Sequence, residues 1–217
     1  EFRRVLFRSS NKECEECIYS NNLSKYPNIK FKKIENDENL FLEIAKLISN
    51  AKVVGIFQGR LEWGARALGN RSILCDPRNE NMKKILNIKI KKRESFRPFA
   101  PSIINDYVNE WFETNKEVPA MMQVFKIKEK KRKLIPAVTH IDGTGRLQTV
   151  SELSNPRYYK IIKNFFKITG VPMIINTSFN ENEPIVSNPD YAIKTFLRTN
   201  MDVLVLQNWL IIRNDIS

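Results

Sequence analysis

The residues best suited to chemistry in this 217-residue chain are arginines and lysines set in loops of Gly, Pro and small residues. Three such segments occur, at 59–72, 91–99 and 140–148. An Arg guanidinium offers phosphate oxygens a planar fork of donors, a Lys ammonium acts as a point charge, and Gly lets backbone N–H groups approach an anion. The pattern predicts an enzyme domain that handles anionic substrates.

The first segment carries Arg60, Arg66 and Arg71 among Gly, Ala and Leu rather than among other polar residues. We expect some of these guanidinium groups to point inward and to need partners. The alternative is a surface turn with solvated charges.

The second segment brings Lys91, Arg93 and Arg97 together after an expected helix. Their mutual repulsion is tolerable in water but several times larger at an effective dielectric of about 20, so a bound polyanion would relieve it. The alternative is a solvated helix end, where cations favour the helix dipole.

The third segment contains His140, which is the only histidine of the chain. A His-rich iron or zinc site is therefore excluded within this chain, and one candidate imidazole base remains. His140 stands near Asp142, Arg146 and Gln148 in a Gly-rich turn, which predicts that these residues line a ligand site. A purely structural histidine is the alternative.

A fourth segment is the apolar run 171–176, which leads directly into polar residues. Asn176, Thr177, Ser178 and Asn180 would expose amide and hydroxyl groups at the carboxyl end of a strand, where open α/β sheets bind ligands. Ordinary turn chemistry is the alternative for the same residues.

These segments need strands and helices to position them. Short apolar runs predict strands at 52–58, 71–75, 122–128, 133–139, 148–150, 171–176, 203–206 and 210–213. Helical spacing and end signals predict helices at about 40–48, 80–88, 107–112, 156–168 and 189–199. Before the last two, a capping Asn precedes a first-turn Pro. The mixture predicts an α/β (α+β) domain with a twisted mixed sheet flanked by helices.

Composition sets the bounds of the domain. Hydrophobic residues make up 42% and charged residues 28%, and the net charge of +12 favours an acidic partner. We expect one domain over 37–217 after an N-terminal arm or linker over 1–36, whose first ten residues read as non-native. No apolar stretch approaches the roughly 20 residues of a membrane span, which predicts a cytoplasmic protein with no membrane partner.

Two further features are weaker signals. Cys14 and Cys17 form a lone CxxC motif, but the intervening glutamates would raise the thiol pKa values, so we expect neither a redox pair nor a zinc site. The basic run at 126–133 lacks interleaved aromatic residues, so we expect a solvated hairpin tip rather than a nucleic-acid interface.

Four long motifs carry a family resemblance. They are Gly-Arg-x-Glu-x-Gly-x-Arg-Ala-Leu-Gly-Asn-Arg-Ser-Ile-Leu at 59–74, Lys-x-Arg-Glu-x-Phe-Arg-Pro-Phe-Ala-Pro at 91–101, Thr-His-x-Asp-Gly-Thr-x-Arg-x-Gln-Thr-Val at 139–150 and Asn-Thr-Ser-Phe-Asn-x-x-Glu-Pro-Ile-Val at 176–186. Over about residues 37 to 213 the chain resembles the carboxy-terminal, YrdC-like domain of the O-carbamoyltransferases of the NodU and CmcH type.

The resemblance implies an activity. In that family the YrdC-like domain converts ATP and carbamoyl phosphate to carbamoyl adenylate, and an amino-terminal kinase-like domain with a His/Asp iron site passes the carbamoyl group to an acceptor hydroxyl. This chain resembles the second domain only, so iron is expected only in the other one. Magnesium is expected with the nucleotide, held mainly through phosphate oxygens, and no metal site is expected on the protein.

The resemblance also assigns residues. Lys91, Arg97 and the loop 176–178 would hold nucleotide phosphates, while Arg66 and Arg146 would hold the carbamoyl donor. The other polar residues of the four segments would line the same site: Arg60, Arg71, Arg93, His140, Asp142, Gln148 and Asn180.

Two other functions remain open from the sequence. A stand-alone RNA-binding module of YrdC-like shape would show a steep salt dependence and indifference to carbamoyl phosphate. An inactive, truncated scaffold would bind no nucleotide. The sequence does not specify the acceptor.

Overall fold

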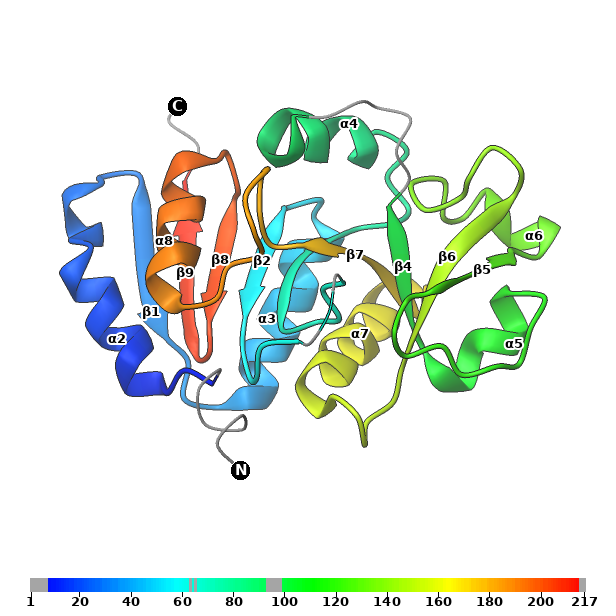
Figure 1. Cartoon of the computed structure of the whole chain (residues 1–217), viewed down its shortest axis with the longest axis horizontal. Coiled ribbons are helices and arrows are strands. Elements are labelled where there is room, and N and C mark those ends of the chain that lie inside the picture. The colour runs from blue at the N-terminus through cyan, green and yellow to red at the C-terminus, as the bar shows by residue number, and fades with distance from the viewer. Residues whose placement is uncertain (1–7, 63, 65, 93–98, 215–217) are drawn as a thin grey trace.

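The computed structural model describes residues 8–62, 64, 66–92 and 99–214. Its strands are β1 (Ile29–Lys33), β2 (Val54–Phe57), β3 (Arg71–Cys75), β4 (Ala100–Ile104), β5 (Gln123–Lys126), β6 (Thr144–Val150), β7 (Met173–Ser178), β8 (Val203–Leu206) and β9 (Trp209–Arg213). Within the described residues they form a nine-stranded sheet in the order β1-β9-β8-β2-β3-β7-β4-β6-β5 (Figure 1). The pairs β2–β8 and β4–β6 are parallel and the others antiparallel, so the predicted mixed sheet is confirmed.

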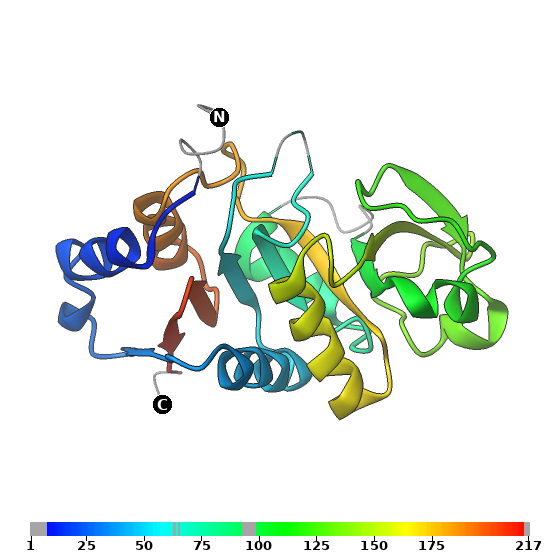
Figure 2. The ribbon, with the colours of Figure 1, turned by 90° about the horizontal axis from the view of Figure 1, so that it is seen from below.

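The helices are α2 (Asn11–Ser20), α3 (Asp37–Ser49), α4 (Met82–Leu86), α5 (Val108–Trp111), α6 (Glu129–Arg132), α7 (Pro156–Thr169) and α8 (Pro189–Arg198), with short helices η1 (Leu23–Lys25), η2 (Asn87–Lys91) and η3 (Asn105–Tyr107). The view of Figure 2 shows α3 and α7 against one face of the sheet and α2 and α8 against the other. Apolar side chains from both layers bury the strands. Helices therefore flank both faces of the sheet.

The predicted starts of α7 and α8 are confirmed. The Asn155 side chain accepts a hydrogen bond from the backbone N–H of Tyr158, and Asn188 does the same for Tyr191. Each Asn is followed by Pro, whose fixed φ and missing N–H suit the first turn. The end of α7 at Gly170, with φ of 72°, also matches the predicted stop.

The predicted arm over residues 11–36 is wrong as a description of local structure. Ser10 and Glu13 form a capping box at the start of α2, and Cys14 and Ile18, one turn apart, are fully buried. Strand β1 pairs along its whole length with β9. The Lys-rich and Asn-rich composition reflects an exposed edge strand and an amphipathic helix, which composition alone does not distinguish from a linker.

One prediction around the β4–β6 region is also wrong. Residues 133–139 form turns rather than a strand, although Ile135, Ala137 and Val138 are buried in the core. The basic run does lie in the connection between the antiparallel strands β5 and β6, where it contains the short helix α6. Strand β4 was not predicted, because Pro101 within it argues against a central strand.

No helix among the described residues is both long enough and apolar enough to cross a bilayer.

Candidate functional site

The strand register brings the four predicted segments to one end of the sheet. Phe57 at the end of β2 pairs with Arg71 at the start of β3, and Ser72 pairs with Ser178 at the end of β7. Next to β7, strand β4 begins at this end, and β6 runs parallel to β4. The loops that precede β3, β4 and β6 and the loop that follows β7 therefore share this end, which we call the loop end.

Residues that pair directly across strands share a face of the sheet, and so do alternate residues along a strand. By this rule one face carries a row of polar residues: Ser72, Ser102, Arg146, Gln148, Asn176 and Ser178. Thr177 pairs with Ile73 and therefore lies on the opposite face. Of the predicted run 176–178, only the first and last residues belong to the polar row.

Three of these side chains form a buried hydrogen-bonded cluster. The amide oxygen of Gln148 accepts from the Asn176 amide at 2.8 Å and from the Ser102 hydroxyl at 2.5 Å. The Asn176 amide also donates to the Ala67 carbonyl at 3.1 Å, and the Gln148 amide donates to the Leu68 carbonyl at 3.0 Å. The cluster therefore holds residues 67 and 68 of the first Arg segment against the sheet. Ser102 was missed because its strand was missed.

Arg71 is fully buried rather than open to a ligand. Its guanidinium donates to the Gln58 carbonyl at 2.5 Å and the Asn70 carbonyl at 3.0 Å, and lies 3.7 Å from the centroid of the Phe57 ring. Burial lowers the pKa of Arg71 to about 10. In this structure the side chain holds the two stems of the first segment together, and its predicted place in the ATP and carbamoyl-phosphate site stays a prediction.

Glu62 occupies a cradle of backbone N–H groups in the same segment. Its Oε1 accepts from the backbone N–H of Leu68 at 3.1 Å, of Asn70 at 2.5 Å and of Arg71 at 3.3 Å. Burial raises the pKa of Glu62, while the hydrogen bonds from Asn70 and Leu68 oppose that shift. The sequence showed Glu62 as the only acid of the segment but gave no sign of this contact.

Lys91 lies against the loop that follows β7. Its Nζ donates to the Ser178 carbonyl at 2.7 Å, the Asn180 carbonyl at 2.8 Å and the Asn180 side-chain oxygen at 2.7 Å, and lies 3.2 Å from the Ser178 hydroxyl. The structure thus brings together Lys91 and Ser178, which were predicted to hold nucleotide phosphates, and Asn180, which was predicted to line the same site. Lys91 is only 2% exposed, so a phosphate would reach it only by displacing these contacts.

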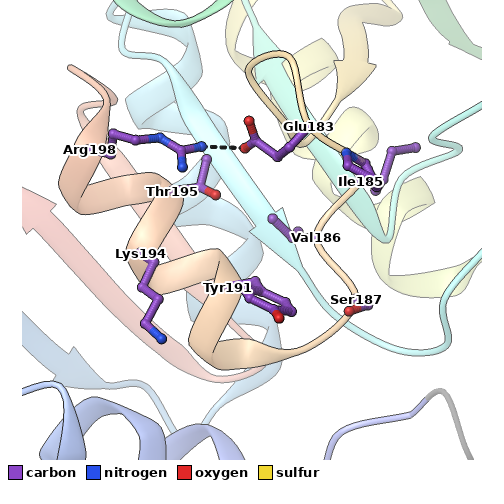
Figure 3. Close-up of a pocket in the computed structure, with 9 residues that line it drawn as sticks. Glu183, Ile185, Val186, Ser187, Tyr191, Lys194, Thr195 and Arg198 are labelled. Carbon is purple, nitrogen blue, oxygen red and sulfur yellow. Dashed lines mark hydrogen bonds and ion pairs between the residues drawn. The ribbon is translucent and has the colours of Figure 1, made fainter.

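The next residues of this loop are fixed by α8. Arg198 on α8 forms ion pairs with Glu181 and Glu183, and Lys92 also pairs with Glu181. Beside them lies a cavity of about 460 Å³ lined by residues 183–187 and by one side of α8 (Figure 3). Arg198 therefore ties α8 to the loop that holds Lys91.

The turn before β6 is built around Thr144. The Asp142 carboxylate accepts from the Thr144 backbone N–H and hydroxyl, which lowers the pKa of Asp142. His140 Nδ1 lies 2.9 Å from the Thr144 hydroxyl, and burial lowers the pKa of His140. His140 is thus held neutral near pH 7 at the loop end, while Asp142 is exposed and serves the turn.

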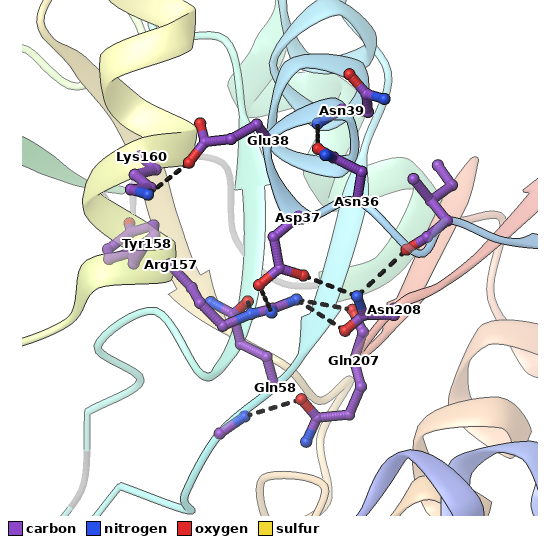
Figure 4. Close-up of polar contacts among 12 residues, drawn as sticks. Asn36, Asp37, Glu38, Asn39, Gln58, Arg157, Tyr158, Lys160, Gln207 and Asn208 are labelled. Atoms are coloured by element: carbon purple, nitrogen blue, oxygen red, sulfur yellow. Dashed lines mark hydrogen bonds and ion pairs between the residues drawn. The ribbon is translucent and has the colours of Figure 1, made fainter.

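A second network supports the base of the first segment (Figure 4). Arg157, in the first turn of α7, donates to the Gln58 side chain at 3.2 Å and pairs with Asp37 at 2.8 Å. The Gln58 amide in turn donates to the Gly69 carbonyl at 2.9 Å, and the Arg157 guanidinium also reaches the Gln207 carbonyl at 3.1 Å. These contacts were missed, because the residues are far apart in sequence.

The remaining predicted residues are exposed or half-buried, or lie outside the described residues. Arg60 is exposed, and Arg66 and Arg146 are half-buried. Arg93 and Arg97 lie outside the described residues. In the part of the chain that the structure describes, no group of three His, Cys, Asp or Glu side chains could hold a metal ion, and all three cysteines are free.

The similarity to known proteins includes the four segments described above. Residues 45–213 match the family described as Carbamoyltransferase C-terminus. The nodulation protein NolNO of Sinorhizobium fredii is 49% identical over 183 residues, which cover 82% of this chain and 27% of that protein. Nodulation protein U of Rhizobium tropici is 39% identical over 139 residues, covering 64% and 24%. The chain thus spans less than a third of either relative.

Among solved structures, full-length HypF in its phosphate- and nucleotide-bound form superposes with a TM-score of 0.53 at 17% identity. The match covers 98% of this chain and 27% of HypF, and it shows a shared fold. Because the family match extends from α3 to the end of β9 and includes all four predicted segments, the chain belongs to the carbamoyltransferase C-terminal family.

Proposed function

We propose that this domain binds ATP and carbamoyl phosphate at the loop end of the sheet and forms carbamoyl adenylate. The observation that carries the proposal is the convergence of four cationic or amide-bearing loops at one end of one sheet, in a chain of this family. HypF, which shares the fold, is described as binding phosphate and nucleotide, and this supports an anion site here.

The proposed roles follow from placement. Lys91, with Ser178 and Asn180, would hold nucleotide phosphates after a phosphate oxygen replaces its present carbonyl partners. Arg97 and Arg93 belong to the same proposed phosphate group, and Arg60 would contribute from the exposed surface. Thr177, on the other face, would act only through its backbone.

Arg66 and Arg146 would bind the carbamoyl donor. Arg146 lies on the polar face two residues before Gln148, close to the segment that carries Arg66. His140 and Asp142 would shape the turn beside Arg146. Asn176 and Gln148 are positioning residues in this scheme, because both hold the backbone of the first Arg segment.

The chemistry needs little from the protein beyond positioned charge. Water cleaves carbamoyl phosphate to carbamate and inorganic phosphate, a carbamate oxygen attacks the α-phosphorus of ATP, and the bond to the β-phosphate oxygen breaks to release pyrophosphate. Negative charge grows on the phosphoryl oxygens, where Arg and Lys side chains stabilise it. Magnesium would be held mainly by phosphate oxygens, with Ser178 and Asn180 as nearby oxygen donors.

Transfer of the carbamoyl group to an acceptor hydroxyl would belong to an amino-terminal kinase-like domain with its own iron. This chain has one histidine and would perform only the first half-reaction.

Exchange of radiolabelled pyrophosphate into ATP tests the proposal. We expect exchange with ATP, magnesium and carbamoyl phosphate, and none without the carbamoyl donor. Lys91→Ala should lower exchange by about 10- to 150-fold, because a hydrogen bond to a charged group contributes about 1.5 to 3 kcal/mol. Lys130→Ala, an exposed site on α6, is the matched control and should change nothing.

Two results would contradict the proposal. Exchange without the donor would indicate that another acid is activated. A folded chain that binds ATP but shows no exchange under any condition would show that this domain alone does not form the adenylate.

A further inference from the structure

The two carboxylate oxygens of Glu62 have different surroundings. Oε1 accepts three backbone hydrogen bonds, from Leu68, Asn70 and Arg71. Oε2 is buried, and no described residue donates a hydrogen bond to it. A buried acceptor without a donor is unfavourable, so its presence calls for a ligand or an ordered water.

Glu62 also lines a cavity. The space is about 210 Å³, and amide side chains of Asn70, Gln148 and Asn155 line it with Glu62. A water molecule takes about 30 Å³ of liquid volume, so the cavity has room for a ligand of a few heavy atoms. The lining also includes Leu68, Pro119 and Val150, so the cavity offers hydrogen-bonding groups beside apolar contacts.

The same segment also contains an unused donor. The Nε atom of Arg66 is buried and has no acceptor among the described residues, although Arg66 does not line the cavity beside Glu62. A carbamoyl group carries N–H donors, which the free oxygen of Glu62 can accept.

We propose that Glu62 recognises the amide nitrogen of the carbamoyl donor. The loop backbone fixes Oε1, and Oε2 accepts an N–H of the ligand. The inference rests on the proposed function, because it names the group that distinguishes carbamoyl phosphate from an acyl phosphate without nitrogen. Glu62 would then be a specificity-determining residue of the donor site.

The first test uses the unaltered chain. Acetyl phosphate replaces the amino group with a methyl group of similar size at the same overall charge, so it lacks only the donor to Oε2. Pyrophosphate exchange should be at least about tenfold more efficient, as kcat/KM, with carbamoyl phosphate. Equal use of both donors would overturn the inference and leave the proposed function intact. Exchange with neither donor would overturn both.

The second test is Glu62→Gln. A Gln can keep one oxygen on the backbone N–H groups, but it places an NH₂ donor where Oε2 stood, facing the N–H of the ligand. The KM for carbamoyl phosphate should rise about ten- to hundredfold, the KM for ATP should stay unchanged, and the preference over acetyl phosphate should disappear. Glu110→Gln, a surface partner of Lys131, is the matched control and should behave like the unaltered chain.

Two outcomes of the variant would overturn the inference. Retained preference for carbamoyl phosphate would show that Oε2 does not contact the nitrogen, and that an ordered water satisfies it. Equal increases in both KM values would show that Glu62 only shapes the loop. Calorimetric titration of the unaltered chain and of Glu62→Gln with carbamoyl phosphate and with acetyl phosphate compares the affinities for the two donors. This measurement does not depend on turnover, so it can be used even when the exchange rate is low.

Discussion

Gly64 and Gly69 form a matched pair within the first Arg segment. Both have φ of 114°, a value that L residues rarely adopt. A Cβ atom at position 69 would lie 2.3 Å from Cδ1 and 2.5 Å from Cγ of Tyr158, whereas a Cβ at position 64 would have no atom within 4 Å. Tyr158 is fully buried at the start of α7, so its ring has no space to move into.

The two substitutions should therefore differ in cost. Backbone strain at a disfavoured φ costs of order 1 to 3 kcal/mol at either position. Overpacking against Tyr158 adds about 1 to 3 kcal/mol at position 69 alone. We expect Gly69→Ala to lower the free energy of unfolding by about 2 to 6 kcal/mol, and Gly64→Ala by about 1 to 3 kcal/mol or less, because its exposed loop can relax.

Urea unfolding at equilibrium measures both changes on the same scale, and the unaltered chain gives the reference. The difference between the two variants sets an upper limit on the cost of the contact between position 69 and Tyr158, because the φ values are equal but the exposed loop at position 64 can relax. Equal losses of stability in the two variants would refute the conclusion that the segment packs directly on Tyr158.

Three further predictions test other parts of the site. Arg71→Lys should lower the free energy of unfolding by about 2 to 3 kcal/mol, because one ammonium cannot replace two nitrogens, of which Nη1 donates to the Gln58 and Asn70 carbonyls and Nη2 to the Gly59 carbonyl. Exposed Arg60→Lys should stay within about 0.5 kcal/mol in the same urea titration. Burial lowers the pKa of His140 below 6.5, so the unfolded chain binds a proton at this residue before the folded chain does as the pH falls. The free energy of unfolding should therefore decline from about pH 6.5 down to the pKa of the folded state. Urea unfolding curves of His140→Gln at about pH 7.5 and about pH 5.5 should lack this part of the decline. Arg198→Ala should change stability by less than about 1 kcal/mol, because its ion pairs are half-exposed, yet weaken ATP binding in calorimetry by loosening the loop around Lys91.

The elements with strong local signals were predictable. Strands β3 and β8 have the predicted bounds, and α7 and α8 start at the predicted Asn-Pro pairs. Strand β4 was not predictable in this way, because Pro101 lacks an N–H; the ladder with β6 begins only at Ser102, so the missing donor is tolerated. In the run 133–139, Ile135, Ala137 and Val138 are buried within turns, and burial alone does not specify a strand.

The candidate site, like the fold, was predictable only in part. Residue types and spacing pointed to four segments, and the strand register brings these segments to one end of the sheet. Residue types and spacing could not distinguish Arg71, which holds the loop, from the arginines nearer the surface. The difference depends on the strand face that each residue occupies. Glu62 and Ser102 were missed for a related reason: their partners are backbone groups or distant side chains that only the folded register brings close.

The central claim is that the loop end joins a carbamoyl group to the α-phosphorus of ATP. Phosphorus NMR of the 217-residue chain with ATP, magnesium and ¹³C-labelled carbamoyl phosphate tests it directly. The account predicts pyrophosphate together with an adenylate whose phosphorus signal is split by the labelled carbon through the new C–O–P linkage. Formation of ADP instead would show transfer of the γ-phosphoryl group, and this result would contradict the account.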